Sequence, residues 1–206
     1  MFKLSSNYFS LAQKIYRIAN TELQEKIDKN KNVIKEILSI SNLSIQVGGG
    51  IRSLKNVENM LESGVSRVIV GTALFQDNFI KELERNFDSS QIVLALDFRI
   101  NNNIPSIYTH GWQDNSEIEL YEFIRNNSFF NNILATGISL DGAMQGPSFS
   151  EYKKILSLFP SLNLIASGGI RSLDDLDLLK TMNINEAIIG KAIYEQNISL
   201  LELTND

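Results

Sequence analysis

The 206-residue sequence predicts an α/β fold of the (β/α)8 TIM-barrel class, and two observations lead to that prediction. Short β-branched runs that end in Gly or Asp alternate with longer stretches of helical periodicity, which is typical of βαβ units around a parallel sheet. The segment Gly49–Leu54 also recurs almost unchanged as Gly168–Leu173, at an offset of 119 residues. Because about four βα units of roughly 30 residues span such an offset, two copies would make the eight units of a closed barrel.

Six strands are predicted from the apolar, β-branched runs. They are Leu43–Val47, Arg67–Val70, Ile92–Leu96, Asn132–Ala135, Asn163–Ala166 and Glu186–Ile189.

Helices are predicted between these strands, and two of them have clear start signals. Ser53 is expected to cap a helix that Gly64 ends, with apolar residues at helical spacing between them. Ser172 and Asp175 form a capping-box-like start for the corresponding helix of the second copy.

Residues 1–42 are predicted to be helical and atypical of a barrel, within a single domain that covers residues 1–206. Their apolar residues recur at helical spacing in two stripes. These are Tyr8, Leu11, Ala12, Ile15 and Ile18, then Val33, Ile34, Ile37 and Leu38. The first two strands of a barrel are therefore expected to be missing. Open edges at the first and last predicted strands would then favour self-association or a complementing chain.

Composition excludes several classes of function. The chain has no cysteine and one histidine, so disulfides, thiolate chemistry and a histidine-based metal site are not expected. A net charge of -5 with scattered lysines argues against nucleic-acid binding. No apolar run is long enough to span a membrane and no secretory signal is visible, so a cytoplasmic protein that binds small molecules is expected.

Glycines follow the predicted strands at the end of the barrel where active sites lie. A Gly-Gly pair between a strand and a helix lets backbone N–H groups approach an anion closely. Two such pairs, each followed one strand later by another glycine, predict two phosphate sites and a substrate with two phosphates. The alternative is that these glycines only make tight turns. The residues are Gly49, Gly50 and Gly71 in one copy, and Gly168, Gly169 and Gly190 in the other.

Asp97 is the best candidate for proton transfer, because it follows an apolar run that would place its carboxylate at the barrel mouth. A helix N-cap or an ion pair with Arg99 is the alternative. Asp141 is a weaker candidate, since Asp-Gly is also an ordinary turn signal. Trp112 lies in a polar and aromatic loop next to His110, and it either covers a flat ring or anchors packing.

Taken together, these segments resemble the phosphoribosylformimino-aminoimidazole-carboxamide ribotide isomerases of histidine biosynthesis. The resemblance runs from about Asn32 to Leu201, roughly four fifths of the chain. Gly111-Trp112-Gln113 favours this family over its sister, the cyclase subunit of imidazole-glycerol-phosphate synthase. The motifs are Gln46–Arg52, Val70–Ala73, Leu96–Asp97, Gly111–Gln113, Ser139–Gly142, Ala166–Ile170 and Ile189–Ala192.

The resemblance implies a (β/α)8 barrel that converts the bisphosphate aminoaldose ProFAR into the aminoketose PRFAR without a cofactor. Asp97 would match one of two catalytic aspartates, and Thr136 and Asp141 would orient the reacting ribose. Trp112 would lie over the aminoimidazole. The implied phosphate-binding set is Gly49, Gly50, Arg52, Gly71 and Thr72 on one side, and Gly168, Gly169, Gly190 and Lys191 on the other.

Three features depart from the family pattern. The opening strands with the family's other catalytic aspartate are not found in the sequence, Gly137 replaces an acidic residue, and His110 replaces an arginine. Ring opening and transfer of the C2 proton need both an acid and a base, so impaired activity is expected. A non-catalytic phosphate-binding remnant, a fragment that needs a second polypeptide, and the cyclase remain as alternatives.

Overall fold

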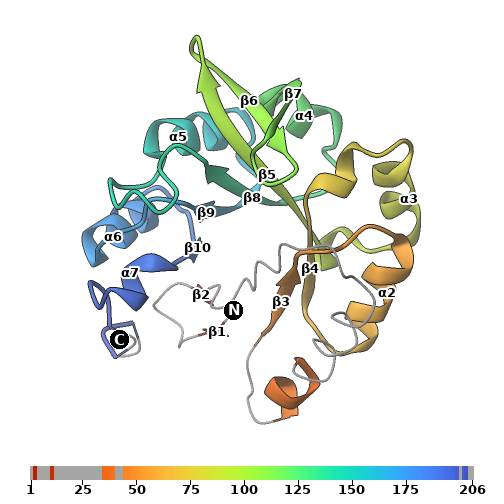
Figure 1. The fold of residues 1–206 in the computed structure, drawn as a ribbon, viewed down its shortest axis with the longest axis horizontal. Helices are drawn as coiled ribbons and strands as arrows, with labels where there is room; N and C mark the ends of the chain where they lie inside the picture. Colours follow the sequence, from red (N-terminus) through yellow and green to blue (C-terminus); the bar gives the residue numbers. More distant parts are fainter. Residues whose placement is uncertain (1, 4–9, 12–33, 40–43, 200, 204–206) are drawn as a thin grey trace.

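The computed structural model describes residues 2–3, 10–11, 34–39, 44–199 and 201–203. A curled sheet forms the centre of the molecule, and its helices lie on the outer side (Figure 1). Its parallel strands follow the order β10-β9-β8-β5-β4-β3, so the prediction of an α/β barrel fold is confirmed. These strands are β3 (Gln46–Gly48), β4 (Arg67–Val70), β5 (Ile92–Asn101), β8 (Asn132–Gly137), β9 (Asn163–Ser167) and β10 (Glu186–Ile188).

Helices lie between the successive parallel strands and after the last of them. They are α2 (Leu54–Glu62), η1 (Thr72–Phe75), α3 (Phe79–Asn86), η2 (Ser89–Gln91), α4 (Leu120–Asn126), α5 (Phe149–Leu158), α6 (Leu173–Thr181) and α7 (Lys191–Tyr194). Among the described residues, no helix is long and apolar enough to cross a membrane.

The predicted start and end of α2 are confirmed. The Ser53 hydroxyl accepts the Asn56 N–H at 3.2 Å, and Gly64 follows the helix with φ 94°.

The capping box predicted for α6 is wrong, because the Ser172 side chain makes no capping hydrogen bond. The Asp175 carboxylate instead accepts the Arg171 N–H at 3.1 Å, one residue before the cap. Asn56 accepts the Arg52 N–H at 3.2 Å in the same way, so both copies of the repeat tie the strand–helix turn to the first helical turn.

The prediction of a helical, strandless N-terminal region is wrong for the residues described there. β1 (Phe2–Lys3) pairs antiparallel with β2 (Ser10–Leu11), and β2 pairs in parallel with β10. An uncovered strand edge leaves backbone N–H and C=O groups unpaired. Pairing of β2 with the edge of β10 satisfies some of these groups, although the apolar residues of this region recur at helical spacing. The edge of β10 is therefore not open as predicted. Residues 34–39 are helical, in agreement with the second stripe. Leu11 of the first stripe lies in β2, and the remaining residues of both stripes lie outside the described residues.

A projecting hairpin was missed by the sequence reasoning. β5 continues five residues beyond the predicted end at Leu96, then pairs antiparallel with β6 (Ile104–Thr109), which pairs with β7 (Asp114–Glu119). Asn102 and Asn103 connect β5 to β6, and their φ values of 49° and 65° are those of a two-residue type I′ turn. This hairpin rises above the rest of the sheet in Figure 1.

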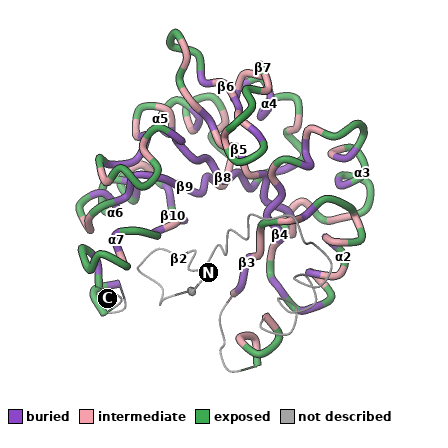
Figure 2. Tube along the Cα trace, in the orientation of Figure 1, coloured by how far each residue is buried: buried purple, intermediate pink, exposed green. Residues whose placement is uncertain are grey.

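The apolar residues of the strands separate into two layers. Ile69, Val93, Leu134 and Ile165 form a small cluster, while alternate residues of the same strands join the large core shared with the helices. Figure 2 shows the strands β8 and β9 as mostly buried, while buried and exposed residues alternate along the helices. The strand positions are thus held by packing from both faces, as a parallel sheet requires.

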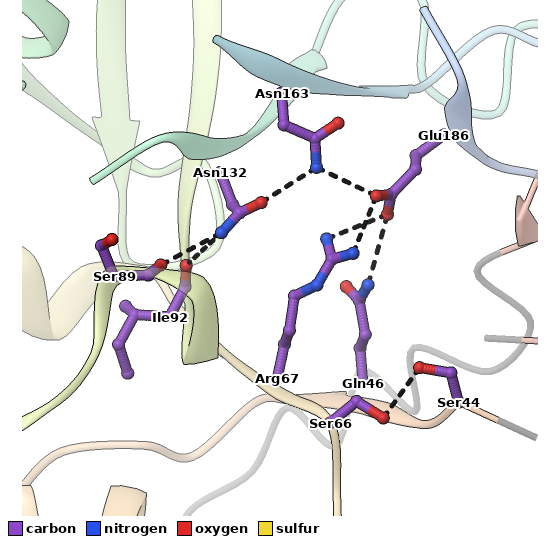
Figure 3. Close-up of polar contacts among 9 residues, drawn as sticks. All are labelled: Ser44, Gln46, Ser66, Arg67, Ser89, Ile92, Asn132, Asn163 and Glu186. Carbon is purple, nitrogen blue, oxygen red and sulfur yellow. Dashed lines mark hydrogen bonds and ion pairs between the residues drawn. The ribbon is translucent and has the colours of Figure 1, made fainter.

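A polar network joins the amino ends of all six parallel strands (Figure 3). The Glu186 carboxylate accepts hydrogen bonds from Arg67 at 2.9 and 3.1 Å, from Gln46 at 3.3 Å and from Asn163 at 2.9 Å. Asn163 also donates to Asn132 at 2.9 Å. Asn132 in turn donates to the Ile92 carbonyl at 3.3 Å. The network links β3 and β4 directly to β10, at the opposite end of the strand order, by side chains.

Candidate active site

The carboxyl ends of three neighbouring strands bring polar residues into one row. Asp97 of β5 pairs in register with Thr136 of β8, and Thr136 pairs with Ser167 of β9. Thr136 and Ser167 are buried, whereas Asp97 is half-buried. The register therefore places Asp97 and Thr136 side by side on neighbouring strands.

Asp97 lies within a continuous strand, not just after one as predicted. Its register partners are Thr136 on one side and Tyr108 on the other, so it stands where the barrel sheet meets the hairpin. The Trp112 indole N–H donates to Asp97 Oδ2 at 2.7 Å. The alternative that Asp97 is a helix N-cap is wrong, because Asp97 lies within β5. The guanidinium of Arg99, the ion-pair partner in the other alternative, lies 4.9 Å from the centre of the Tyr108 ring.

Asp141 lies in a turn after β8, where its N–H donates to the Gly137 carbonyl at 3.1 Å. The same residue borders the site, because a Cβ atom built on Gly168 would lie 3.4 Å from both Asp141 Cβ and Thr136 Cγ2. The Lys191 ammonium donates to the Gly142 carbonyl at 3.1 Å. The structure thus brings together Thr136, the Asp141 turn, Gly168 and Lys191, all of them predicted site residues.

The two Gly-Gly turns have nearly the same backbone in both copies of the repeat. Gly49 and Gly50 have φ values of 100° and 70°, and Gly168 and Gly169 have values of 88° and 81°. These left-handed conformations favour glycine strongly. The glycines one strand later also match, with φ −115° and ψ −107° at Gly71 and φ −110° and ψ −94° at Gly190.

Packing accounts for some of these glycines and not for others. A Cβ on Gly169 would collide with the Gly146 carbonyl, and one on Gly168 would lie 3.1 Å from the Gly137 carbonyl. A Cβ on Gly190 or Gly50 would meet no heavy atom within 4 Å. The tight-turn explanation therefore suffices for Gly168 and Gly169, whereas at Gly190 neither a positive φ nor a close neighbour calls for glycine.

Gly137, where the resembled family has an acidic residue, is also explained by packing. A Cβ at this position would collide with the hydroxyl of the buried Ser148.

The tip of the β6–β7 hairpin reaches across to the first glycine set. The His110 N–H donates to the Thr72 hydroxyl at 3.4 Å, and His110 Nδ1 lies 3.0 Å from Asp114 Oδ2. Trp112 of the same tip contacts Asp97. One short loop therefore connects Thr72 and Asp97. The Arg52 N–H donates to the Asn56 side chain in the first turn of α2, and Arg52 is exposed.

Tyr152 is a supporting residue that the sequence reasoning missed. Its fully buried hydroxyl lies 2.8 Å from the Ser167 carbonyl and 3.1 Å from the Ala135 carbonyl, and it accepts the Ser167 N–H at 3.2 Å. Burial raises the pKa of this phenol well above its usual value. The only sequence signal was a tyrosine among apolar residues in the segment between two predicted strands. Its position ties β8 and β9 together just before Gly168.

Comparison with known proteins was made against families and against individual relatives. The sequence profile of the family described as "Histidine biosynthesis protein" matches residues 11–199.

Three relatives carry the same name, the isomerase of 1-(5-phosphoribosyl)-5-((5-phosphoribosylamino)methylideneamino)imidazole-4-carboxamide. The protein from Francisella philomiragia is 40% identical over 172 residues, which covers 82% of this chain and 71% of the relative. That from Elusimicrobium minutum is 36% identical over 203 residues, or 97% of this chain and 85% of the relative. That from Oceanobacillus iheyensis is 38% identical over 176 residues, or 84% and 71%.

Proposed function

Because this chain belongs to the histidine biosynthesis protein family, we propose that it catalyses the aminoaldose-to-aminoketose isomerisation for which its relatives are named. The observation that best supports the proposal is the pairing of Asp97 with Thr136 at the barrel mouth. The names of the relatives favour this isomerase over the cyclase that the sequence had left as an alternative.

The reaction moves protons without changing the composition of the substrate. Protonation of the ribose ring oxygen opens the ring to an iminium, loss of the C2 proton then gives an enolamine, and protonation at C1 with loss of the C2 hydroxyl proton gives the ketone. Asp97 is proposed to carry protons in these steps, since a half-buried carboxylate beside the ribose can act as acid and as base in turn. Thr136 and Asp141 are proposed to orient the ribose.

The two glycine sets are proposed to hold the two phosphates of the substrate. Backbone N–H groups of left-handed glycines form anion-binding concavities, and the matching backbone of the two copies supports two equivalent sites. Gly49, Gly50, Gly71 and Thr72 would bind one phosphate. Gly168, Gly169, Gly190 and Lys191 would bind the other, and Arg52 borders the first.

We propose that few side chains of this chain can transfer protons at the site. The strand that pairs with β10 is Ser10–Leu11, which contains no carboxylate among its two described residues. Asp97 would then do work that a paired acid and base would share, and turnover by this chain should be slow.

We also propose the compartment in which the reaction takes place and the way in which the chain self-associates. A substrate with two phosphates is charged and stays in the compartment where it is made, so we place the reaction in the cytoplasm. Self-association remains a proposal for the other end of the sheet, because the described residues pair β3 with β4 alone.

A genetic test decides the proposed function. The gene should support growth without histidine in a strain that lacks the isomerase, and the Asp97→Asn variant should not. The matched control Asp77→Asn, which removes an exposed carboxylate outside the site, should grow like the wild type. Absence of growth with the wild-type gene at high, soluble expression would contradict the proposal.

A further inference from the structure

We infer that Trp112 is a positioning residue for the Asp97 carboxylate, in addition to any contact its ring makes with substrate; the inference rests on the proposed function. The observation is the 2.7 Å hydrogen bond from the indole N–H to Asp97 Oδ2. A charge-assisted hydrogen bond of this length holds the carboxylate in one rotamer and occupies one of its two oxygens. The Asp97 carboxylate then approaches the ribose in a fixed orientation.

The backbone conformation at the tip of the β6–β7 hairpin places the Trp112 indole next to Asp97. His110, Gly111 and Trp112 have φ values of 49°, 69° and 75°, three left-handed residues in succession. Such conformations are costly outside glycine and persist where surrounding contacts determine them. The Thr109 carbonyl accepts the N–H groups of Trp112 at 3.0 Å and Gln113 at 3.2 Å, which closes the turn.

One further contact holds the tip against the barrel, and a second lies within the tip. The His110 N–H donates to the Thr72 hydroxyl at 3.4 Å, and His110 Nδ1 lies 3.0 Å from Asp114. Trp112 is itself half-buried. The indole donor therefore belongs to a loop anchored on both sides, and loss of its N–H should change the order of Asp97 rather than the position of the loop.

The first test is spectroscopic and does not depend on catalysis. Trp112 is the only tryptophan of the chain, so tryptophan fluorescence reports on the surroundings of this one indole, which include the Asp97 carboxylate. We expect Asp97→Asn and Asp97→Ala to shift the emission maximum and the quantum yield, because the carboxylate is the acceptor of the indole N–H. Asp77→Asn, which removes an exposed carboxylate outside the hairpin, should leave the emission unchanged. An equal response of Asp97 and Asp77 variants would overturn the assignment, as would no response in either.

The second test separates positioning from ring stacking. Trp112→Phe keeps an aromatic face, although a smaller one, and removes the N–H donor. We expect kcat to fall about tenfold, the value of a hydrogen bond to a charged group, while the Kd of the aminoketose product changes less than about twofold. A raised Kd with unchanged kcat would mean that the ring acts only by contact with the ligand. If the wild-type protein shows no turnover, the proposed function fails, and the fluorescence result still decides the contact.

Discussion

Arg67 and Glu186 occupy equivalent positions of the two repeat copies, 119 residues apart, and they bind each other across the floor of the barrel. The guanidinium meets the carboxylate through two hydrogen bonds of 2.9 and 3.1 Å, with side-chain exposures of 22% and 9%. Arg67 begins β4 and Glu186 begins β10, which lie near opposite ends of the strand order. The pair therefore connects through side chains two strands that share no backbone hydrogen bonds.

Breaking this pair should destabilise the fold without touching the mouth. Arg67→Met leaves Glu186 as a buried charge that has lost its main partner, and we expect a loss of about 3 to 5 kcal/mol in the free energy of unfolding. Urea denaturation followed by circular dichroism measures it. The double variant Arg67→Met with Glu186→Leu should be less destabilised than Arg67→Met alone. If the double variant loses as much free energy of unfolding as Arg67→Met and Glu186→Leu lose together when measured singly, the pair does not couple the strands.

Adding a side chain at Gly190 should weaken phosphate binding while leaving the fold intact. Its Cβ would meet no heavy atom within 4 Å and its φ is −110°, so Gly190→Ala brings no clash in the protein. A methyl group there should keep a phosphate from the backbone and weaken binding of the aminoketose product at least about tenfold, or about 1.4 kcal/mol. Gly71→Ala, whose Cβ would lie 3.8 Å from the Ala95 Cβ, tests the other phosphate.

Calorimetry with the product measures both effects, and Ser157→Ala on the exposed face of α5 is the control. Unchanged affinity in both glycine variants would contradict the phosphate assignment. Gly169 is a poor site for the same test, because any side chain there would collide with Gly146 and the loss would not be specific to phosphate.

Buried tyrosines should make stability fall in alkaline solution. Burial raises the pKa of Tyr121 to about 12 and that of Tyr152 further, from the ordinary value of 10.0. The folded state thus favours the protonated phenols. Their contribution is complete below pH 10, where the unfolded chain also holds the protons, and it is lost as pH rises above that value.

Thermal unfolding measured between pH 8 and pH 11 tests whether the stability of the fold decreases as the pH rises. Tyr152→Phe should lower stability by about 1 to 3 kcal/mol at pH 8, because Ser167 loses a buried hydrogen-bond partner, and should flatten the alkaline decline. Tyr194→Phe, at an 82% exposed residue, should leave both unchanged. An equally steep decline in Tyr152→Phe would show that other groups cause it.

Local signals were enough to predict the βα framework and the residues at the strand ends. Arg67–Val70 is a strand with the predicted bounds, and Ser53 caps α2 as expected, because both depend on short-range periodicity and capping. The row formed by Asp97 and Thr136 follows once strands are parallel and in register.

The hairpin carried a signal that was overlooked. Beyond Leu96, polar residues alternate with Phe98 and Ile100 up to Asn102 and Asn103, which is the pattern of a strand entering a type I′ turn. The strand was predicted to end at Leu96 because the apolar run ends there, whereas it continues through Asp97. The contact of Trp112 with Asp97 depends on that continuation.

Other features depend on contacts distant in sequence. The pairing of β2 with β10 joins Ser10–Leu11 to residues about 176 positions later, and no local pattern indicates it. The partners of Glu186 come from three other strands, and its charge at the start of an apolar strand has no local explanation. The Tyr152 hydroxyl likewise reaches the Ala135 and Ser167 carbonyls only when α5 packs against β8 and β9.

The most direct test is the rate at which the purified 206-residue chain converts the bisphosphate aminoaldose to the aminoketose, with and without Asp97. We expect slow but measurable turnover by the wild type. Asp97→Asn should lower kcat by about 10² to 10⁴-fold, the usual contribution of a positioned proton-transfer group, with little change in the Kd of the product. Product affinity in the variant shows that its site is intact. Turnover that survives Asp97→Asn at the wild-type rate would contradict the account, because the protons would then move through another group.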